Sequence, residues 1–179
     1  MTEVGTNYGG ALYELAAAEE LSEEILDQLQ ALSKSFAEEP AFVKLLCAHS
    51  LSKTERCRIL DDSFAGKVHP YVLNFLKILT EKGYMRQFPD CCKAYLVRYH
   101  KDNNILPVTA VTAVALSQEQ AARLKEKLEK LTENTVELTN RMDPNVLGGV
   151  RLDFDGKSID DTLAHRLESV RNLLNNTIL

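Results

Sequence analysis

The chain has 179 residues, of which 45% are hydrophobic and 26% charged, and it contains no tryptophan. This is the composition of a globular protein whose core is built mainly from aliphatic side chains. The net charge of −5 argues against broad nucleic-acid binding and against adhesion to anionic lipid, because both need a basic surface.

The first half of the chain has the periodicity of short amphipathic helices. Apolar residues recur at i, i+3, i+4 and i+7 in residues 8–15, and the same spacing returns in residues 25–36. Pro40 suits the first turn of a third helix. Ser52 and Glu55 have the spacing of a capping box, which predicts the start of a fourth helix.

Two further helices are predicted before residue 104. Pro70 begins the fifth, and Gly83 follows its last turn as a left-handed cap. A sixth apolar stripe runs through residues 88–99. Because the connections are short, we expect the six helices to pack as one bundle in residues 1–104.

The period changes after the polar break at residues 101–104. Residues 106–116 alternate as a strand, Ser117 and Gln120 form a second capping box ahead of a helix, and residues 136–142 suggest another strand. A final amphipathic helix is predicted from the residues Leu163, Leu167, Val170 and Leu174. The predicted fold is therefore α+β and mostly α, with a small α+β domain in residues 105–179.

A short turn and hairpin motif stands between the second strand and the final helix. Asp143 and Pro144 open a turn, since proline fixes one dihedral and restricts the residue before it. Gly148 and Gly149 permit backbone angles that a Cβ forbids. Period-2 alternation over residues 150–154 then predicts a strand with one buried face, and Asp155-Gly156 predicts a tight hairpin turn into a return strand around Ile159.

Motifs for catalysis are absent from the sequence. It has no phosphate-binding loop, no dinucleotide fingerprint and no zinc-protease motif, so we predict a non-enzyme without cofactor or metal. Asp153 and Asp155 support a metal-dependent hydrolase only as a remote alternative, and a solvated turn is favoured. Cys91 and Cys92 suit neither zinc ligation nor a mutual disulfide; buried thiols are favoured over a redox sensor.

The N-terminal residues lack the features of a secretory or transit peptide, and no apolar run reaches the length that spans a bilayer. We therefore expect a bacterial cytoplasmic protein that reaches a membrane only through a partner. Six glutamates precede the first basic residue, Lys34. They are interpreted as a solvated face, with an acidic rim for a basic partner as the alternative.

Four segments in the same order resemble one family. The family is the delta subunit of F-type ATP synthases, to which the mitochondrial oligomycin-sensitivity-conferring protein belongs. Its first helix resembles residues 8–16, its fourth-helix start residues 51–56, its fifth helix residues 72–83 and its C-terminal signature residues 143–154. Three residues depart from the pattern. Gly9 and Gly10 replace good helix formers at about 1 kcal/mol each, and Asp153 stands where relatives are often basic.

The resemblance implies a non-catalytic peripheral-stalk subunit of a proton-driven ATP synthase, present in one copy at the cytoplasmic face of the bacterial cell membrane without direct insertion. It implies that the bundle binds the N-terminal helix of an alpha subunit and that the C-terminal domain binds the C-terminal helices of the b subunits. The alpha helix would lie in a groove between the first and fifth helices, formed by Tyr8, Ala11, Leu12, Leu15, Val72, Phe75, Leu76 and Leu79. A free-standing helical adaptor unrelated to the ATPase is the alternative.

Overall fold

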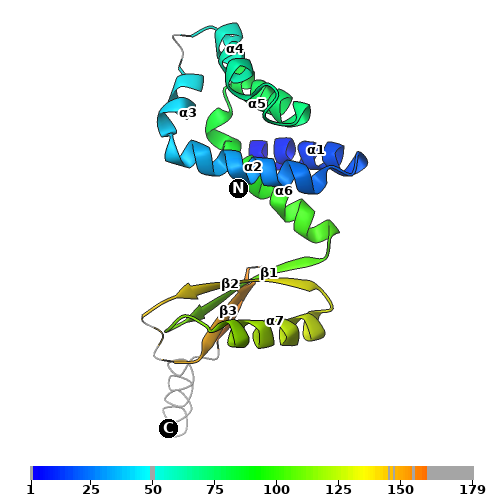
Figure 1. Cartoon of the computed structure of the whole chain (residues 1–179), viewed down its shortest axis with the longest axis vertical. Helices are drawn as coiled ribbons and strands as arrows, with labels where there is room; N and C mark the ends of the chain where they lie inside the picture. Colours follow the sequence, from blue (N-terminus) through cyan, green and yellow to red (C-terminus); the bar gives the residue numbers. More distant parts are fainter. Residues whose placement is uncertain (1, 49–50, 145, 147, 155, 161–179) are drawn as a thin grey trace, which may run out of the picture. The chain divides into compact units, whose positions relative to one another are not determined.

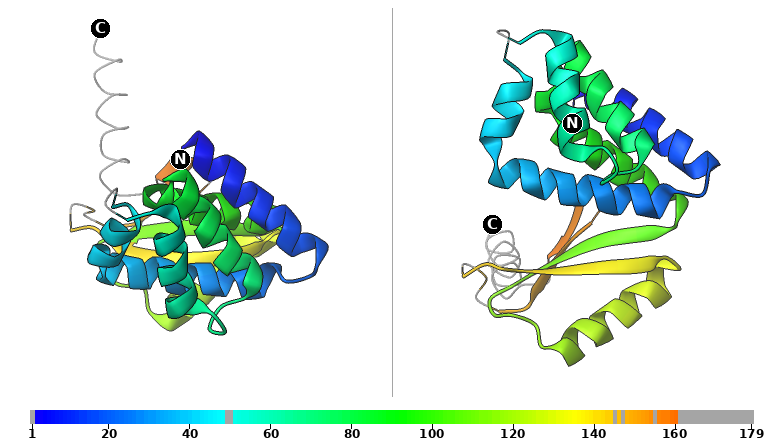
Figure 2. Two further views of the ribbon diagram at one scale, coloured as in Figure 1. Left: turned by 90° about the horizontal axis from the view of Figure 1, so that it is seen from above. Right: turned by 45° about the horizontal axis from the view of Figure 1, so that its top comes forward.

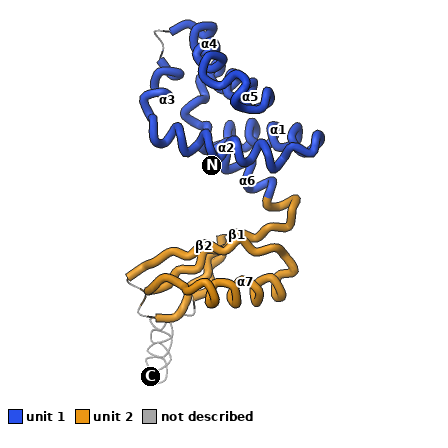
Figure 3. Tube along the Cα trace, viewed as in Figure 1, with its two compact units in different colours: residues 1–99 blue, residues 100–179 orange. Residues whose placement is uncertain are grey.

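A computed structural model describes residues 2–48, 51–144, 146, 148–154 and 156–160. The chain divides into two compact units, residues 1–99 and 100–179 (Figure 3). The first unit is helical, and the described part of the second combines one helix with a four-stranded sheet. The fold is therefore α+β and mostly α, as predicted.

The described part of the first unit is built of helical elements (Figure 1). They are α1 (Glu3–Ala18), α2 (Ser22–Glu38), α3 (Pro40–Leu46), α4 (Lys53–Phe64), α5 (Pro70–Lys82), the 3-10 turn η1 (Met85–Gln87) and α6 (Phe88–Asp102). Large apolar side chains from all six α-helices meet in one core. Among them, Ile25, Leu76 and Tyr95 are completely buried, and the Tyr95 hydroxyl donates a hydrogen bond to the Ser22 carbonyl at 2.8 Å.

The helix ends follow the local chemistry predicted from the sequence. Ser52 Oγ accepts a hydrogen bond from the Glu55 amide at 3.2 Å, and the Glu55 carboxylate accepts one from the Ser52 amide at 2.8 Å, so the capping box is confirmed. Gly83 ends α5 with a left-handed φ of 77°. Pro40 and Pro70 occupy first-turn positions, where the missing amide hydrogen breaks no helical bond.

The glycines of α1 have a packing role that the sequence did not suggest. A Cβ on Gly9 would lie 2.2 Å from the Cys91 carbonyl oxygen, and a Cβ on Gly5 would lie 2.7 Å from the Asp90 Cβ. The backbones of α1 and α6 approach closely only because both positions lack a side chain. The Thr2 amide also donates to the Asp90 carboxylate at 3.0 Å, which ties the start of α1 to α6.

The second unit is a mixed sheet with the strand order β2-β1-β3-β4. Its elements are β1 (Ile105–Thr112), α7 (Gln118–Thr132), β2 (Thr135–Met142), β3 (Val150–Phe154) and β4 (Lys157–Asp160). β1 and β2 are parallel and are connected through α7, which packs along β2, and the remaining pairs are antiparallel. Figures 1 and 2 show α7 beside the sheet.

The first strand is shorter than predicted. It ends at Thr112, where the Thr112 hydroxyl donates to the Val114 carbonyl at 2.7 Å. The Asn140 side chain also accepts from the Leu116 amide at 3.0 Å. These side-chain bonds replace ladder bonds and lead the chain into the Ser117 capping box, which is confirmed. The expected final helix lies outside the described residues, as does Asp155 of the β3–β4 turn.

Candidate partner-binding site

A groove lies between α1 and α5 of the first unit. It encloses about 440 Å³ and is lined by Tyr8, Ala11, Leu12, Leu15, Tyr71, Asn74, Phe75 and Ile78. Leu12 and Phe75 form its floor, with 5% and 6% of their surface exposed, while Leu15 and Ile78 are each 44% exposed. Exposed large aliphatic side chains on both sides of a concave surface are typical of a binding site for an apolar helix face.

The structure brings together five of the eight residues predicted for this groove. Val72, Leu76 and Leu79 do not line it, because they are completely buried in the core of the unit. On α5 they belong to the stripe that faces inward. The neighbouring stripe faces the groove and has the same i, i+4, i+7 spacing, in Tyr71, Phe75 and Ile78.

Periodicity on α5 therefore identified an apolar helix with two adjacent apolar stripes, but it could not say which stripe packs inward. Tyr71 and Ile78 were missed for this reason. The signal that could have found them is the width of the apolar arc on α5, since a helix with a single buried face needs only one stripe.

The lining of the groove carries no charged side chain. The Tyr71 hydroxyl at its edge donates to the Glu19 carboxylate at 2.9 Å, and this hydrogen bond raises the pKa of Tyr71. Tyr8 packs edge-on against Tyr84, with ring centroids 5.9 Å apart. Glu14 pairs with Arg98. The aromatic rings that border the groove are thus held by their own contacts, which favours a preformed surface.

The signature after β2 forms a turn. The Asp143 amide donates to the Thr112 carbonyl at 2.9 Å, and the Val146 amide donates to the Asp143 carbonyl at 3.1 Å, with Pro144 between them. Gly149 has a φ of 87°, in the left-handed region that other residues avoid, and Gly148 has a φ of 152°. The predicted conformational role of the glycine pair agrees with these angles.

Asp153, a member of the remote metal-site alternative, is held by protein groups. Its carboxylate accepts a hydrogen bond from Ser158 Oγ at 2.7 Å and pairs with Arg151 at 3.2 Å. The hydrogen bond from Ser158 and the pairing with Arg151 hold its pKa below the usual range. Within the described ranges, no three histidine, cysteine or acidic side chains gather as a metal site.

The adjacent cysteines differ from reactive thiols. Burial raises the pKa of Cys91 to about 11 and that of Cys92 to about 12. The Asp90 carboxylate adds to the effect at Cys91, and the neighbouring Cys91 thiol adds to it at Cys92. A thiol must ionise to react, so the raised pKa values disfavour reaction of both thiols in the folded chain at neutral pH. In the part of the chain that the structure describes, no helix combines the length and apolar character needed to cross a bilayer.

A helical unit with an uncharged surface groove, followed in the chain by a small α+β unit, defines a binding protein built of two units. The model of the ATP synthase delta (OSCP) subunit family matches residues 4–174, and the chain belongs to this family.

Curated relatives named ATP synthase subunit delta match the chain over nearly their whole length. The protein from Alkaliphilus oremlandii is 28% identical over 98% of both chains. The protein from Enterococcus hirae is 32% identical over 96% of both, and that from Gloeobacter violaceus is 31% identical over 94% of this chain and 92% of its own. A chain in the cryo-EM structure of the Toxoplasma gondii mitochondrial ATP synthase hexamer shares the fold, with a TM-score of 0.75 over 97% of this chain and 98% of that one, at 16% identity.

Membership of the family establishes the role. The chain is a non-catalytic stator subunit of a proton-transporting ATP synthase, and it belongs to a membrane-associated complex. The alternative of an adaptor unrelated to the ATPase is therefore wrong, and so is the metal-dependent hydrolase.

Proposed function

We propose that this subunit connects the catalytic head of the synthase to its peripheral stalk through two separate binding surfaces. Residues 1–104 form a six-helix bundle that receives the N-terminal helix of one alpha subunit in the groove between α1 and α5. Residues 105–179 form the domain that receives the C-terminal helices of the b subunits. One copy serves each complex, at the cytoplasmic face of the bacterial cell membrane.

The groove is the observation that carries this proposal. Its apolar floor, its exposed Leu15 and Ile78 and its uncharged lining match what an amphipathic helix buries. A partner helix that covers these side chains removes apolar surface from water on both sides of the contact, at about 25 cal/mol per Å² of buried area.

Such a contact suits the mechanical task. Rotation of the central shaft pushes the catalytic head around, and the stator must hold the head without dissociating. No bond is made or broken, so the subunit acts through slow dissociation and stiffness. The edge-on pairing of Tyr8 with Tyr84 and the hydrogen bond of Tyr71 to Glu19 hold parts of the groove in shape before the partner arrives, which reduces the entropy lost on binding.

Two substitutions at the groove test the proposal. Leu15→Glu and Ile78→Glu should each weaken binding of a synthetic peptide with the alpha-subunit N-terminal sequence by about a hundredfold or more, since a charge without a partner would be buried in an apolar contact. Both positions are 44% exposed, so the free subunit should fold normally. Isothermal titration calorimetry measures the affinity.

Val97→Glu supplies the matched control, because Val97 is 56% exposed on α6 and does not line the groove. Its peptide affinity should equal that of the unaltered chain. Circular dichroism must show native helicity for all three variants. Full peptide affinity in folded Leu15→Glu and Ile78→Glu would remove the groove between α1 and α5 from the interface with the alpha subunit.

A further inference from the structure

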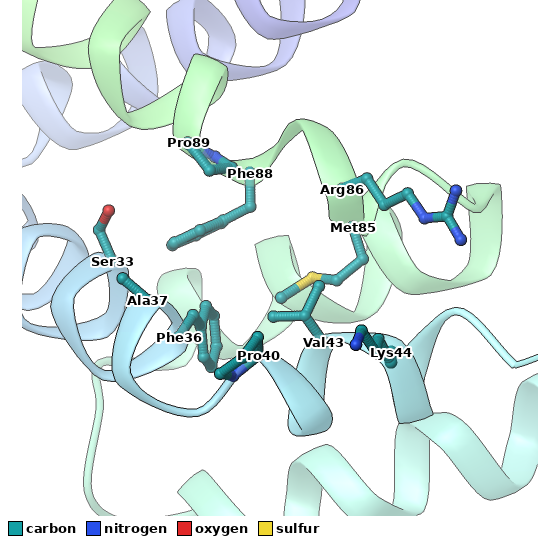
Figure 4. A pocket seen from close by; sticks show the side chains of 10 residues that line it. All are labelled: Ser33, Phe36, Ala37, Pro40, Val43, Lys44, Met85, Arg86, Phe88 and Pro89. Atoms are coloured by element: carbon teal, nitrogen blue, oxygen red, sulfur yellow. The ribbon is translucent and has the colours of Figure 1, made fainter.

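A second groove crosses the first unit, away from the lining of the α1–α5 groove. Two hollows of about 480 and 430 Å³ lie along α2, bordered by α6 and, in the larger one, by α3 and η1 (Figure 4). Ser33, Ala37 and Pro89 line both hollows, so the two form one continuous surface. We call this surface the α2–α6 groove.

The floor of the α2–α6 groove is apolar. Met85 and Phe88 are 1% exposed and Phe36 is 8% exposed, so these side chains belong to the core and present only an edge to the groove. In Figure 4 the rings of Phe36 and Phe88 and the side chain of Met85 lie around the hollow. Leu29 and Leu96 continue the apolar lining in the second hollow.

The charged residues that line the groove are all cations. They are Lys34, Lys44, Arg86 and Lys93. All four are exposed, and Lys34, Lys44 and Arg86 form no ion pair with any residue in the described ranges. Lys93 lies near Asp90, whose pKa is lowered mainly by hydrogen bonds from Thr2 and to a smaller extent by Lys93. The rim is thus locally basic on a chain whose net charge is −5.

The length of the groove fits a short helix. Along α2 its lining runs from Leu26 to Ala37, which corresponds to about 16 Å at the helical rise. A partner helix of three turns covers this distance. An apolar floor with cations on the rim complements an amphipathic helix whose polar face carries carboxylates.

We propose that the α2–α6 groove is a second protein-binding site of this subunit, and that its occupant is an acidic amphipathic helix of a partner protein. The chemistry of its rim separates it from the α1–α5 groove, whose lining has no charge. One subunit can thus hold two helices of different character at once. Attraction between the cations and the carboxylates speeds association, and the apolar floor slows dissociation.

A designed peptide tests the proposal on the full chain. The probe is a fluorescein-labelled helix of about 15 residues, with leucines at i, i+3, i+4, i+7 and i+11 and with glutamate and alanine elsewhere. A matched probe carries lysine in place of glutamate. Fluorescence anisotropy should show binding of the acidic probe only, and its affinity should fall as salt rises, because salt screens exposed charges.

Charge reversal on the rim supplies the decisive comparison. The double variant Lys44→Glu/Arg86→Glu should bind the acidic probe at least about tenfold more weakly, since two attractions become repulsions. The control Lys53→Glu/Lys82→Glu changes the net charge equally at exposed positions outside the groove and should leave the affinity unchanged. Leu15→Glu should also leave it unchanged, which separates this site from the groove proposed for the alpha subunit.

Four results would overturn the proposal. The first is an equal loss of affinity for the acidic probe in both double variants, and the second is a loss of that affinity in Leu15→Glu. The third is binding of the unaltered chain to phosphatidylserine vesicles, abolished by Lys44→Glu/Arg86→Glu. The fourth is a dimer of the unaltered chain in sedimentation, dissociated by the same double variant. The first indicates attraction to net charge alone and the second the α1–α5 groove. The third and fourth indicate a lipid surface and a second copy of the chain.

Discussion

The two units bury different kinds of side chain. The core of the first unit consists mainly of large side chains, among them Ile25, Leu76 and Tyr95. In the described part of the second unit, the buried residues are small or β-branched, such as Val108, Ala110 and Val136. Its helix α7 has no buried residue at all. An apolar stripe in the sequence therefore predicts a helix equally well in both units, but it does not predict how deeply that helix is buried.

The largest expected effect compares the apolar stripe of α5 in the first unit with that of α7 in the second. Leu76→Ala removes a completely buried side chain of α5 and should lower the free energy of unfolding by about 2–5 kcal/mol. Leu128→Ala on α7 removes a half-buried one and should cost about 1 kcal/mol or less. Urea unfolding followed by circular dichroism measures both. Equal losses would mean that α7 contributes as much stability as α5.

The next effect tests the close approach of α1 and α6. Gly9→Ala should lower the free energy of unfolding by about 1–3 kcal/mol, since the new Cβ meets a backbone carbonyl that cannot move away. Gly10→Ala is the matched control. There the Cβ meets the flexible end of Arg98, and the better helix propensity of alanine offsets the contact by about 1 kcal/mol. A Gly9→Ala chain as stable as Gly10→Ala would contradict the packing role of Gly9.

A smaller effect is expected in the second unit at the signature glycines. Gly149→Val should cost about 1–2 kcal/mol, because valine is strained at a φ of 87°. The proposed interface with the b subunits should weaken in a pull-down, while binding of the alpha peptide to the first unit stays unchanged. Stability and stalk binding equal to those of the unaltered chain would show that the glycine has no conformational role.

The smallest effect concerns the thiols of α6. With a pKa of about 11, only about one Cys91 thiol in a thousand is ionised at pH 8, so Cys91 and Cys92 should react with a disulfide reagent only as fast as the chain opens. Cys57 and Cys92 are both partly exposed, but burial raises the pKa of Cys92 to about 12, so Cys57 should react sooner. Because the folded-state pKa values lie above the ordinary thiol value of 9.0, the thiols favour the folded state below pH 9, and stability should fall as the pH rises further. Fast labelling of all four cysteines at pH 8 would contradict this assignment.

The ends of the helices were predictable from the sequence, whereas contacts between residues far apart in the sequence were not. The Ser52 and Ser117 capping boxes and the Gly83 cap depend on a few consecutive residues, so their patterns predicted them. The inward direction of Val72, Leu76 and Leu79 depends on which helices surround α5, and periodicity contains no such information. Gly9 looked like a cost to helix stability, because its contact partner is more than 80 residues away in the sequence.

The tie between α1 and α6 has a consequence for biosynthesis. The Thr2 amide bonds to a carboxylate 88 residues further along the chain, and Gly5 and Gly9 face Asp90 and Cys91 at the start of α6. A ribosome makes the N-terminal end first, so α1 leaves the exit tunnel long before α6 exists. During that interval α2 can already cover part of the apolar face of α1. The glycine surface that receives α6 stays in water, and a chain that stops before residue 88 would leave that surface uncovered.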